Sequence, residues 1–230
     1  MGTVMFYVAL AKALGSEQPF YAFQSQGLYD DHPAHATIPE MAGHYIAEMR
    51  TVQPAGPYRL VGFCLGATIA YEMARQLNDA DERVSLLASF DGIAPWFKPL
   101  GDAWSAAPKQ GVGRLLHRAR TQFFNRRNQF LRAYMQRRGG PVPRLFKKFA
   151  SYIQVNNHMA KTSYVPTLRI PGDVHVFTVK GRYPQPSLGW ERYVKGNVLV
   201  EEIPGELNAH RDLMDPPMVG DLARRLAALL

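Results

Sequence analysis

The sequence predicts an α/β fold in which helices flank a mostly parallel sheet. Two observations support this prediction. Short apolar runs rich in β-branched and aromatic residues alternate along the chain with segments of helical periodicity, which is the order that parallel β-α-β units produce. The 230 residues are 47% hydrophobic and 20% charged, which is the composition of a globular protein with a sizeable core and not of a disordered chain.

The first predicted elements are a strand and a helix. An aromatic-rich run at Pro19–Gln24 predicts a short strand. A helix is predicted at Ile38–Val52, because apolar side chains recur there every three or four residues. Thr37 is its predicted N-cap, and Glu40 follows three residues later, which is the spacing of a capping box.

The middle of the chain predicts a strand, a helix and a second strand in close succession. Tyr58–Phe63 has the apolar character of a buried strand, and Leu65–Leu77 consists of good helix formers throughout. Val84–Phe90 is the next predicted strand, and Asp91 follows it directly. These three elements form one predicted β-α-β unit.

A long insertion precedes the last predicted elements, which are strands at Val174–Val179 and Val198–Ile203 and an amphipathic helix at Met218–Leu230. The insertion spans about residues 96–150, and apolar side chains recur in it at about one heptad with arginines between them. These apolar side chains are Leu116, Ala119, Phe123, Phe130 and Tyr134. We expect an amphipathic helical pair that covers the top of the sheet as a lid, within a single domain of residues 1–230.

Positive charge is concentrated in one part of the chain. Between Ala103 and Gly172 there are 14 Lys and Arg and no Asp or Glu, whereas the remainder carries 13 basic and 19 acidic residues. Such a block raises the idea of a nucleic-acid partner, but no zinc-finger spacing and no RRM-type aromatic-glycine signature accompanies it. We therefore expect no nucleic-acid partner. A solvated helical face remains an open alternative for the basic segment.

Composition also excludes several other classes of protein. A single cysteine cannot form a disulfide framework, and no Cys/His cluster has zinc spacing, so no metal site is expected. No run approaches 18 consecutive apolar residues, which argues against a membrane partner. The N-terminus lacks the features of a secretory signal. The predicted compartment is the reducing cytoplasm; the oligomeric state is not predicted.

The motif that predicts chemistry runs from Gly62 to Gly66, with Cys64 at its centre. It joins a predicted strand to a predicted helix, which is the layout of a nucleophile elbow with cysteine in place of serine. Gly62 and Gly66 meet the need for small residues in the tight turn. The helix N-terminus would lower the pKa of the thiol, and the N–H of Leu65 would receive an oxyanion. The motif alone also fits an inert buried cysteine, and its position between strand and helix favours the nucleophile.

Two further residues complete a predicted triad in the order nucleophile, acid, base. Asp91 closes the next strand, 27 residues after Cys64, and His210 follows the last strand. A carboxylate there would orient the imidazole. The alternatives are a turn aspartate before Gly92 and an exposed loop histidine.

With these residues in view, the sequence resembles the thioesterase domains of nonribosomal peptide and polyketide synthases, which have the α/β-hydrolase fold. The resemblance covers nearly the whole chain and is most specific from Gly56 to Arg75. The other matching segments are Ala22-Phe23-Gln24 with Gly27-Leu28, Met41–Tyr45, Leu87–Asp91, Leu188-Gly189-Trp190 and Ile203-Pro204-Gly205.

The sequence departs from that family in three places. Cys64 replaces the usual serine, so the chain resembles the minority with a cysteine nucleophile. Such domains open with a strand and a His-Pro-x-Gly-Gly loop that donates a second oxyanion N–H, and Gly2 matches only the last glycine. We therefore expect the N-terminal strands and that donor to be missing here. The loop before His210 is about three residues longer than the common form, and this weakens the assignment of that histidine.

The resemblance implies a thioesterase that releases an acyl, peptidyl or polyketide chain, by hydrolysis or cyclisation, through a thioester on Cys64. Its substrate would arrive on the 4'-phosphopantetheine arm of an acyl or peptidyl carrier domain, with no bound cofactor. Four lid arginines are expected to seat that carrier: Arg126, Arg127, Arg137 and Arg138. Two alternatives remain: a free-standing cysteine hydrolase of small esters or lactones, and a truncated relative that only docks a carrier.

Overall fold

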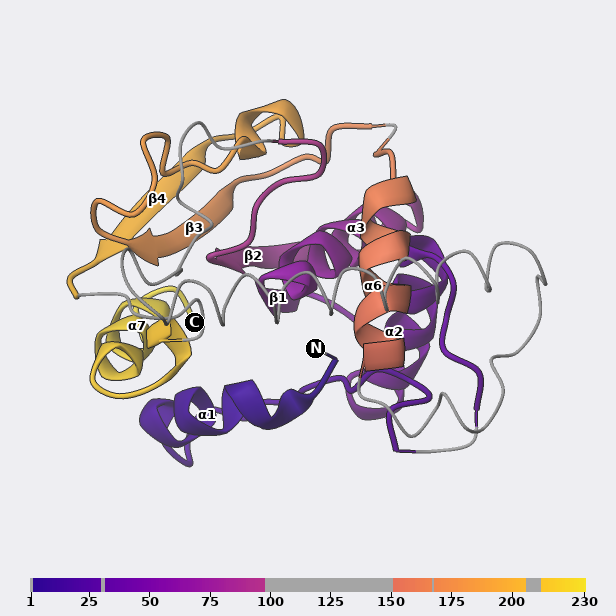
Figure 1. Cartoon of the computed structure of the whole chain (residues 1–230), viewed down its shortest axis with the longest axis horizontal. Helices are drawn as coiled ribbons and strands as arrows, with labels where there is room; N and C mark the ends of the chain where they lie inside the picture. The colour runs from indigo at the N-terminus through magenta and orange to yellow at the C-terminus, as the bar shows by residue number, and fades with distance from the viewer. Residues whose placement is uncertain (1, 30–31, 98–150, 167, 206–211) are drawn as a thin grey trace, which may run out of the picture.

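The computed structural model describes residues 2–29, 32–97, 151–166, 168–205 and 212–230. Their centre is a four-stranded sheet in the order β1-β2-β3-β4, and every neighbouring pair is parallel (Figure 1). The strands are β1 (Tyr58–Phe63), β2 (Val84–Phe90), β3 (Val174–Val179) and β4 (Val198–Ile203). The predicted fold class, a mostly parallel sheet flanked by helices, is confirmed.

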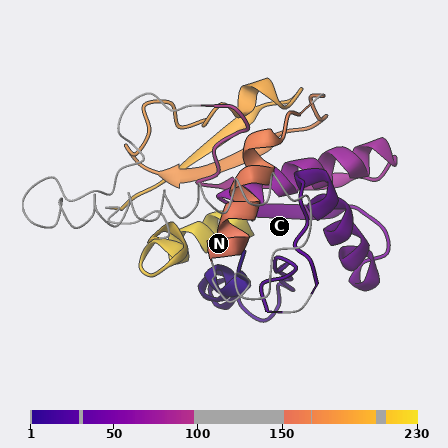
Figure 2. The same ribbon diagram turned by 45° about the vertical axis from the view of Figure 1, so that its right-hand side comes forward.

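Helices cover both faces of this sheet. On one face, α2 (Ile38–Val52) packs against α3 (Leu65–Asp79), which lies on β1 and β2, and α6 (Ser151–Ser163) packs against α3 (Figure 1). On the other face, α1 (Val8–Leu14) lies beside α7 (Met218–Ala227), as Figure 2 also shows. Single-turn 3-10 helices are η1 (Val4–Tyr7), η2 (Trp190–Arg192) and η3 (Asp212–Met214).

Alternation along the strands explains why both faces are covered. In β2, Leu87 belongs to the core with α2 and α3, whereas Leu86 and Ala88 belong to the core with α1 and α7. Successive side chains of a strand point to opposite faces, so an apolar strand needs a helical layer on each side. The continuous apolar runs seen in the sequence are therefore those of a sheet buried on both faces.

Several predicted bounds agree with the structure. The four strands have the predicted limits, and α2 begins at the capping box in which Thr37 and Glu40 bind each other's backbone. The helix predicted at Leu65–Leu77 extends two residues further, and the one predicted at Met218–Leu230 ends at Ala227.

Two features of the N-terminal part differ from the sequence-based prediction. The strand predicted at Pro19–Gln24 is wrong: this segment has no regular structure. Its aromatic side chains pack against helices instead, Phe20 against Tyr7 and Phe23 against Tyr45. Aromatic character therefore reflected packing of the two half-buried phenylalanines and not pairing of the backbone. The helix α1 was not predicted.

Candidate active site

Cys64 occupies the turn between β1 and α3. Its backbone has φ 56° and ψ −114°, a conformation that is uncommon for a residue with a side chain. A Cβ on Gly62 would lie 2.2 Å from the carbonyl carbon and oxygen of Gly66, so the turn can close only with glycine at position 62. The motif therefore forms a sharp strand-to-helix elbow with a partly exposed thiol-bearing residue at its apex.

Asp91 comes to the same edge of the sheet as Cys64. In the parallel β1–β2 pair, Phe63 is in register with Phe90, so the residue after each strand leaves the sheet at the same level. The Cys64 N–H donates to the Phe90 carbonyl at 3.0 Å, which ties the elbow to the end of β2. The structure thus brings the predicted nucleophile and the predicted acid to neighbouring strand ends; their catalytic roles stay predictions.

Groups from β3 and the following turn hold Asp91. The Asp91 N–H donates to the Phe177 carbonyl at 2.8 Å, and the Thr178 hydroxyl donates to Oδ1 at 3.3 Å. Arg182 Nε lies 3.5 Å from Oδ2, and the Asp91 side chain is fully buried. A buried carboxylate needs such partners, because burial without them strongly disfavours its charge. The arrangement therefore fixes a carboxylate at the edge where an imidazole could be oriented.

Tyr7 supports the elbow from η1. Its hydroxyl accepts a hydrogen bond from the Phe63 N–H at 2.9 Å, and a Cβ on Gly66 would lie 3.1 Å from this oxygen. Part of the residue is exposed, but burial of the hydroxyl raises the pKa of Tyr7 to about 12. The hydroxyl is therefore protonated at neutral pH and braces the turn without adding charge.

The first turn of α3 is open to an anion. No side chain caps the helix at Cys64, and its first turn contains no acidic residue. Backbone N–H groups at a helix start carry partial positive charge and favour a negative group nearby. The N–H of Leu65, the first residue of α3, is the predicted oxyanion donor, and this assignment stays a prediction.

Sequence analysis missed Thr178, Arg182, Tyr7 and Lys161 among the groups around the elbow. The first two follow from topology, because Thr178 and Arg182 lie at the carboxyl end of β3, beside the end of β2. No sequence signal identifies Tyr7 or Lys161. The predicted base His210 lies outside the described residues, as do Arg126, Arg127, Arg137 and Arg138 and most of the lid predicted at about 96–150.

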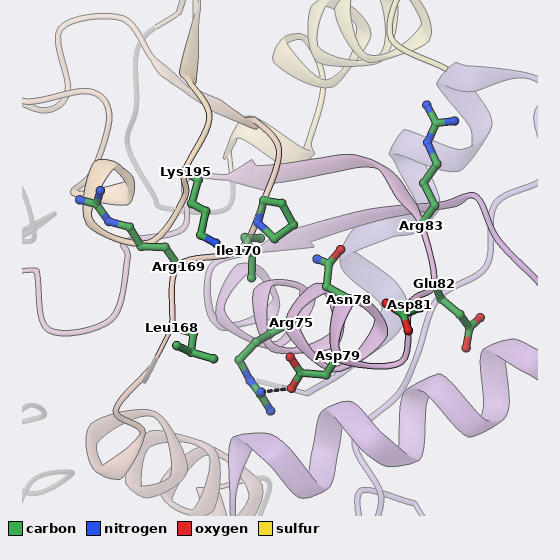
Figure 3. A pocket seen from close by; sticks show the side chains of 11 residues that line it. Arg75, Asn78, Asp79, Asp81, Glu82, Arg83, Leu168, Arg169, Ile170 and Lys195 are labelled. Carbon is green, nitrogen blue, oxygen red and sulfur yellow. Dashed lines mark hydrogen bonds and ion pairs between the residues drawn. The ribbon is translucent and has the colours of Figure 1, made fainter.

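A surface cavity lies at the other end of α3. It has a volume of about 550 Å³, and residues of the last turns of α3, including Arg75, Asn78 and Asp79, line it together with Lys195 (Figure 3). A helix of this length places that end about 20 Å from Cys64. The cavity is therefore separate from the candidate active site.

Two surveys of the described part of the chain concern other kinds of site. There, no three His, Cys, Asp or Glu side chains gather in a way that could hold a metal ion. Within the same residues, no helix has both the length and the apolar character that crossing a membrane requires.

Comparison with known proteins identifies a family. Residues 1–102 match the Thioesterase domain family. The chain is 28% identical over 216 residues to the malpinin synthetase of Mortierella alpina, an alignment that covers 92% of this chain and 3% of the synthetase. It is 38% identical over 97 residues to the dimodular nonribosomal peptide synthase of Bacillus subtilis, covering 42% of this chain and 4% of that protein. The chain thus spans a small fraction of these relatives.

Solved structures share the fold over almost the whole chain. The four-domain nonribosomal peptide synthetase holo-AB3403, bound to AMP and glycine, matches with a TM-score of 0.73 at 26% identity, covering 99% of this chain and 18% of that one. The RedJ thioesterase from the prodiginine pathway of Streptomyces coelicolor matches with a TM-score of 0.65 at 20% identity, covering 100% of this chain and 86% of that one. The second likeness concerns the fold alone.

Proposed function

From the premise that this chain is a relative of the thioesterase domains of nonribosomal peptide synthetases, we propose that it releases an acyl, peptidyl or polyketide chain from the phosphopantetheine arm of a carrier domain. The observation that carries the proposal is the elbow, where Cys64 sits in a left-handed turn beside Asp91. An accessible nucleophile on such a turn is what acyl transfer requires.

In the first step, the Cys64 sulfur attacks the thioester carbonyl carbon. The bond from that carbon to Cys64 forms, the bond to the pantetheine sulfur breaks, and the Leu65 N–H stabilises the oxyanion. Cys64 attacks either as the thiolate or with His210 as general base. In the second case His210 takes the proton of the thiol and gives it to the departing pantetheine thiolate, while Asp91 orients the imidazole. The product of this step is a thioester on Cys64.

In the second step, water, a hydroxyl or an amine attacks the acyl-Cys64 carbonyl. His210 removes a proton from this nucleophile and returns it to the Cys64 sulfur as the bond between sulfur and carbon breaks. The product is an acid, a lactone or a lactam. Because one thioester replaces another in the first step, the acyl group keeps its activation, and this favours release by weak nucleophiles.

Four arginines of the basic insertion supply the proposed docking surface for the carrier: Arg126, Arg127, Arg137 and Arg138. Carrier domains are generally acidic, and the phosphopantetheine arm adds a phosphodiester charge. Complementary charge increases the association rate more than it increases the final affinity, and salt screens it over about 8 Å at physiological ionic strength. The insertion would then act before chemistry begins.

Intact-protein mass spectrometry tests the proposed nucleophile. Incubation with an acyl-pantetheine thioester should add the acyl mass to the full chain, and Cys64→Ala should abolish both the adduct and turnover while the circular dichroism spectrum is unchanged. Since Cys64 is the single cysteine, the adduct has one expected thiol site. Undiminished turnover by the folded alanine variant would end the covalent mechanism. A chain that binds a carrier without any adduct would favour a docking relative, and turnover of small esters with no gain from a carrier would favour a free-standing hydrolase.

The docking surface is tested by reversing all four arginines to glutamate. With a carrier-bound substrate, we expect kcat/KM at low salt to fall about tenfold and its salt dependence to disappear. A small soluble thioester, which needs no docking, serves as the control and should be turned over almost as before. Equal losses with both substrates would mean that the insertion has a structural role.

A further inference from the structure

Lys161 reaches from α6 toward the elbow. It lies in the basic part of the sequence, but the residue is only partly exposed to solvent. Its Nζ lies 3.5 Å from the carbonyl oxygen of Ile93, a residue of the loop that leaves β2 directly after Asp91. This loop also borders the elbow, because a Cβ on Gly92 would lie 3.0 Å from the Cys64 carbonyl oxygen. The Lys161 ammonium is thus held at the loop that borders the elbow.

The surroundings of Lys161 offer little compensation for its charge. Across the described residues, no carboxylate lies within ion-pair distance of it, and the Ile93 carbonyl is at the limit of hydrogen bonding. Burial lowers the pKa of Lys161, and interaction with the charged form of Cys64 acts in the opposite direction. The Cys64 thiolate is therefore a group that favours the protonated lysine.

Each element packed around Cys64 contributes a different kind of group. From η1, Tyr7 presents a neutral hydroxyl, since its pKa is raised to about 12. From the end of β2 comes Asp91, whose negative charge lies close to Arg182. From α6 comes Lys161, whose charge acts on Cys64. Lys161 thus places a positive charge at the loop bordering the elbow, in addition to the partial charge at the start of α3.

We propose that Lys161 is a positioning residue that holds Cys64 in the thiolate form. This proposal rests on the proposed function only in taking Cys64 as the nucleophile. The thiolate is the reactive form of cysteine, and nearby cations stabilise it. Attack then forms the bond between the sulfur and the acyl carbon without a prior proton transfer, and the departing pantetheine thiolate takes its proton from solvent. A serine at position 64 would stay protonated beside Lys161, so the lysine would assist a cysteine nucleophile in a way that it could not assist a serine.

The pH profile of Cys64 alkylation by iodoacetamide tests this proposal on the full chain. The signal belongs to one residue, because the protein has a single cysteine. Lys161→Met removes the charge with little change of size, and it should raise the midpoint of the profile by roughly one pH unit, with alkylation about tenfold slower below the midpoint. Lys161→Arg should restore most of the wild-type profile. Lys195→Met, which removes an exposed lysine at the far end of α3, should leave it unchanged.

If folded Lys161→Met has the wild-type pH midpoint of Cys64 alkylation, the proposal is overturned. The proposal is also overturned if this midpoint rises equally in Lys161→Met and Lys161→Arg. If Lys161→Met does not fold, Lys161→Gln gives the same test. Alkylation needs no turnover, so the two proposals fail separately. A shifted midpoint without any acyl adduct would end the proposed function alone, and an adduct without the shift would end the role of Lys161 alone.

Discussion

At its first turn, α3 begins from Cys64 with a left-handed backbone and no side-chain cap, whereas the middle of the same helix holds a fully partnered carboxylate. That carboxylate is Glu72, which is 1% exposed. It accepts hydrogen bonds from Arg75 Nε and Nη2, each at 2.8 Å, from Gln76 Nε2 at 2.9 Å and from the Tyr164 hydroxyl at 2.6 Å. The same helix therefore has a start without a side-chain cap and a buried carboxylate that accepts four hydrogen bonds.

The difference separates a part of α3 that stabilises the fold, around Glu72, from a part that could react, at Cys64. Around Glu72, donors from α3 and from the residue after α6 compensate the charge, so two helices are joined at a fixed point. At Cys64, the backbone is strained, and the positive end of the helix has no side-chain cap and no acidic residue in its first turn. Strain at a reactive residue persists only when the surrounding structure enforces it. The surroundings of Cys64 and those of Glu72 should therefore respond differently to substitution.

The largest expected effect is at the elbow, with Gly62→Ala. The new Cβ would lie 2.2 Å from backbone atoms of Gly66, and neither chain segment can retreat without opening the turn. We expect a loss of more than about 3 kcal/mol in the free energy of unfolding and no acyl adduct on Cys64. Chemical denaturation measures the first quantity and intact-protein mass spectrometry the second.

Gly66→Ala is the matched control for this prediction. Its Cβ would meet only the Tyr7 hydroxyl, at 3.1 Å, and alanine is a better helix former than glycine. We expect a change of less than about 1 kcal/mol in the free energy of unfolding. Similar costs for the two variants would show that steric limits at position 62 do not hold the elbow.

Much of the fold was predictable because the determining patterns are local. The strands appear as short apolar runs, and α2 was predicted with both limits because Thr37 and Glu40 mark its start within four residues. The prediction for Pro19–Gln24 failed for a physical reason: aromatic side chains indicate that a segment packs against its neighbours, but they do not show that its backbone pairs. Strand pairing depends on a second segment, and no local pattern reveals it.

Part of the candidate site was also predictable from local patterns, and part was not. Cys64 and Asp91 could be found because each directly follows a strand, and parallel strands end at one edge. Arg182 belongs to that edge as well, but its role depends on the register of a strand far along the chain. Lys161 could not be found, because a count of charges does not distinguish a buried lysine from its solvated neighbours.

A smaller effect is expected in the middle of α3, with Glu72→Gln. Burial opposes the charge of Glu72, but hydrogen bonds from Arg75, Tyr164 and Gln76 outweigh burial and lower its pKa below the ordinary 4.5. Replacing this carboxylate leaves the buried part of Arg75 without its ion pair, and we expect a loss of about 2–3 kcal/mol at pH 7. The loss is less than that of a completely buried pair, because the Arg75 side chain is 21% exposed.

The pH dependence of Glu72→Gln has a definite sign. A carboxylate with a lowered folded-state pKa contributes its full stability above its unfolded pKa and loses it as pH falls through the folded value. The difference between wild type and variant should therefore be constant at neutral pH and shrink below about pH 4.5. Denaturation curves between pH 3 and pH 7, extrapolated linearly to zero denaturant, give this difference directly. A difference that grows toward acid pH would contradict the assignment.

The smallest effect is expected for Asp79→Asn, which changes the second acidic partner of Arg75. Asp79 Oδ2 lies 2.5 Å from Arg75 Nη1, but its side chain is 56% exposed, so solvent screens the pair (Figure 3). Its negative charge also lies at the helix C-terminus, where the macrodipole disfavours it. The ion pair with Arg75 and the unfavourable position at the helix C-terminus oppose each other. We therefore expect Asp79→Asn to change the free energy of unfolding by at most about 0.5 kcal/mol, with no effect on the pH profile of Cys64 alkylation. A cost equal to that of Glu72→Gln would mean that exposed and buried partners of Arg75 stabilise α3 alike.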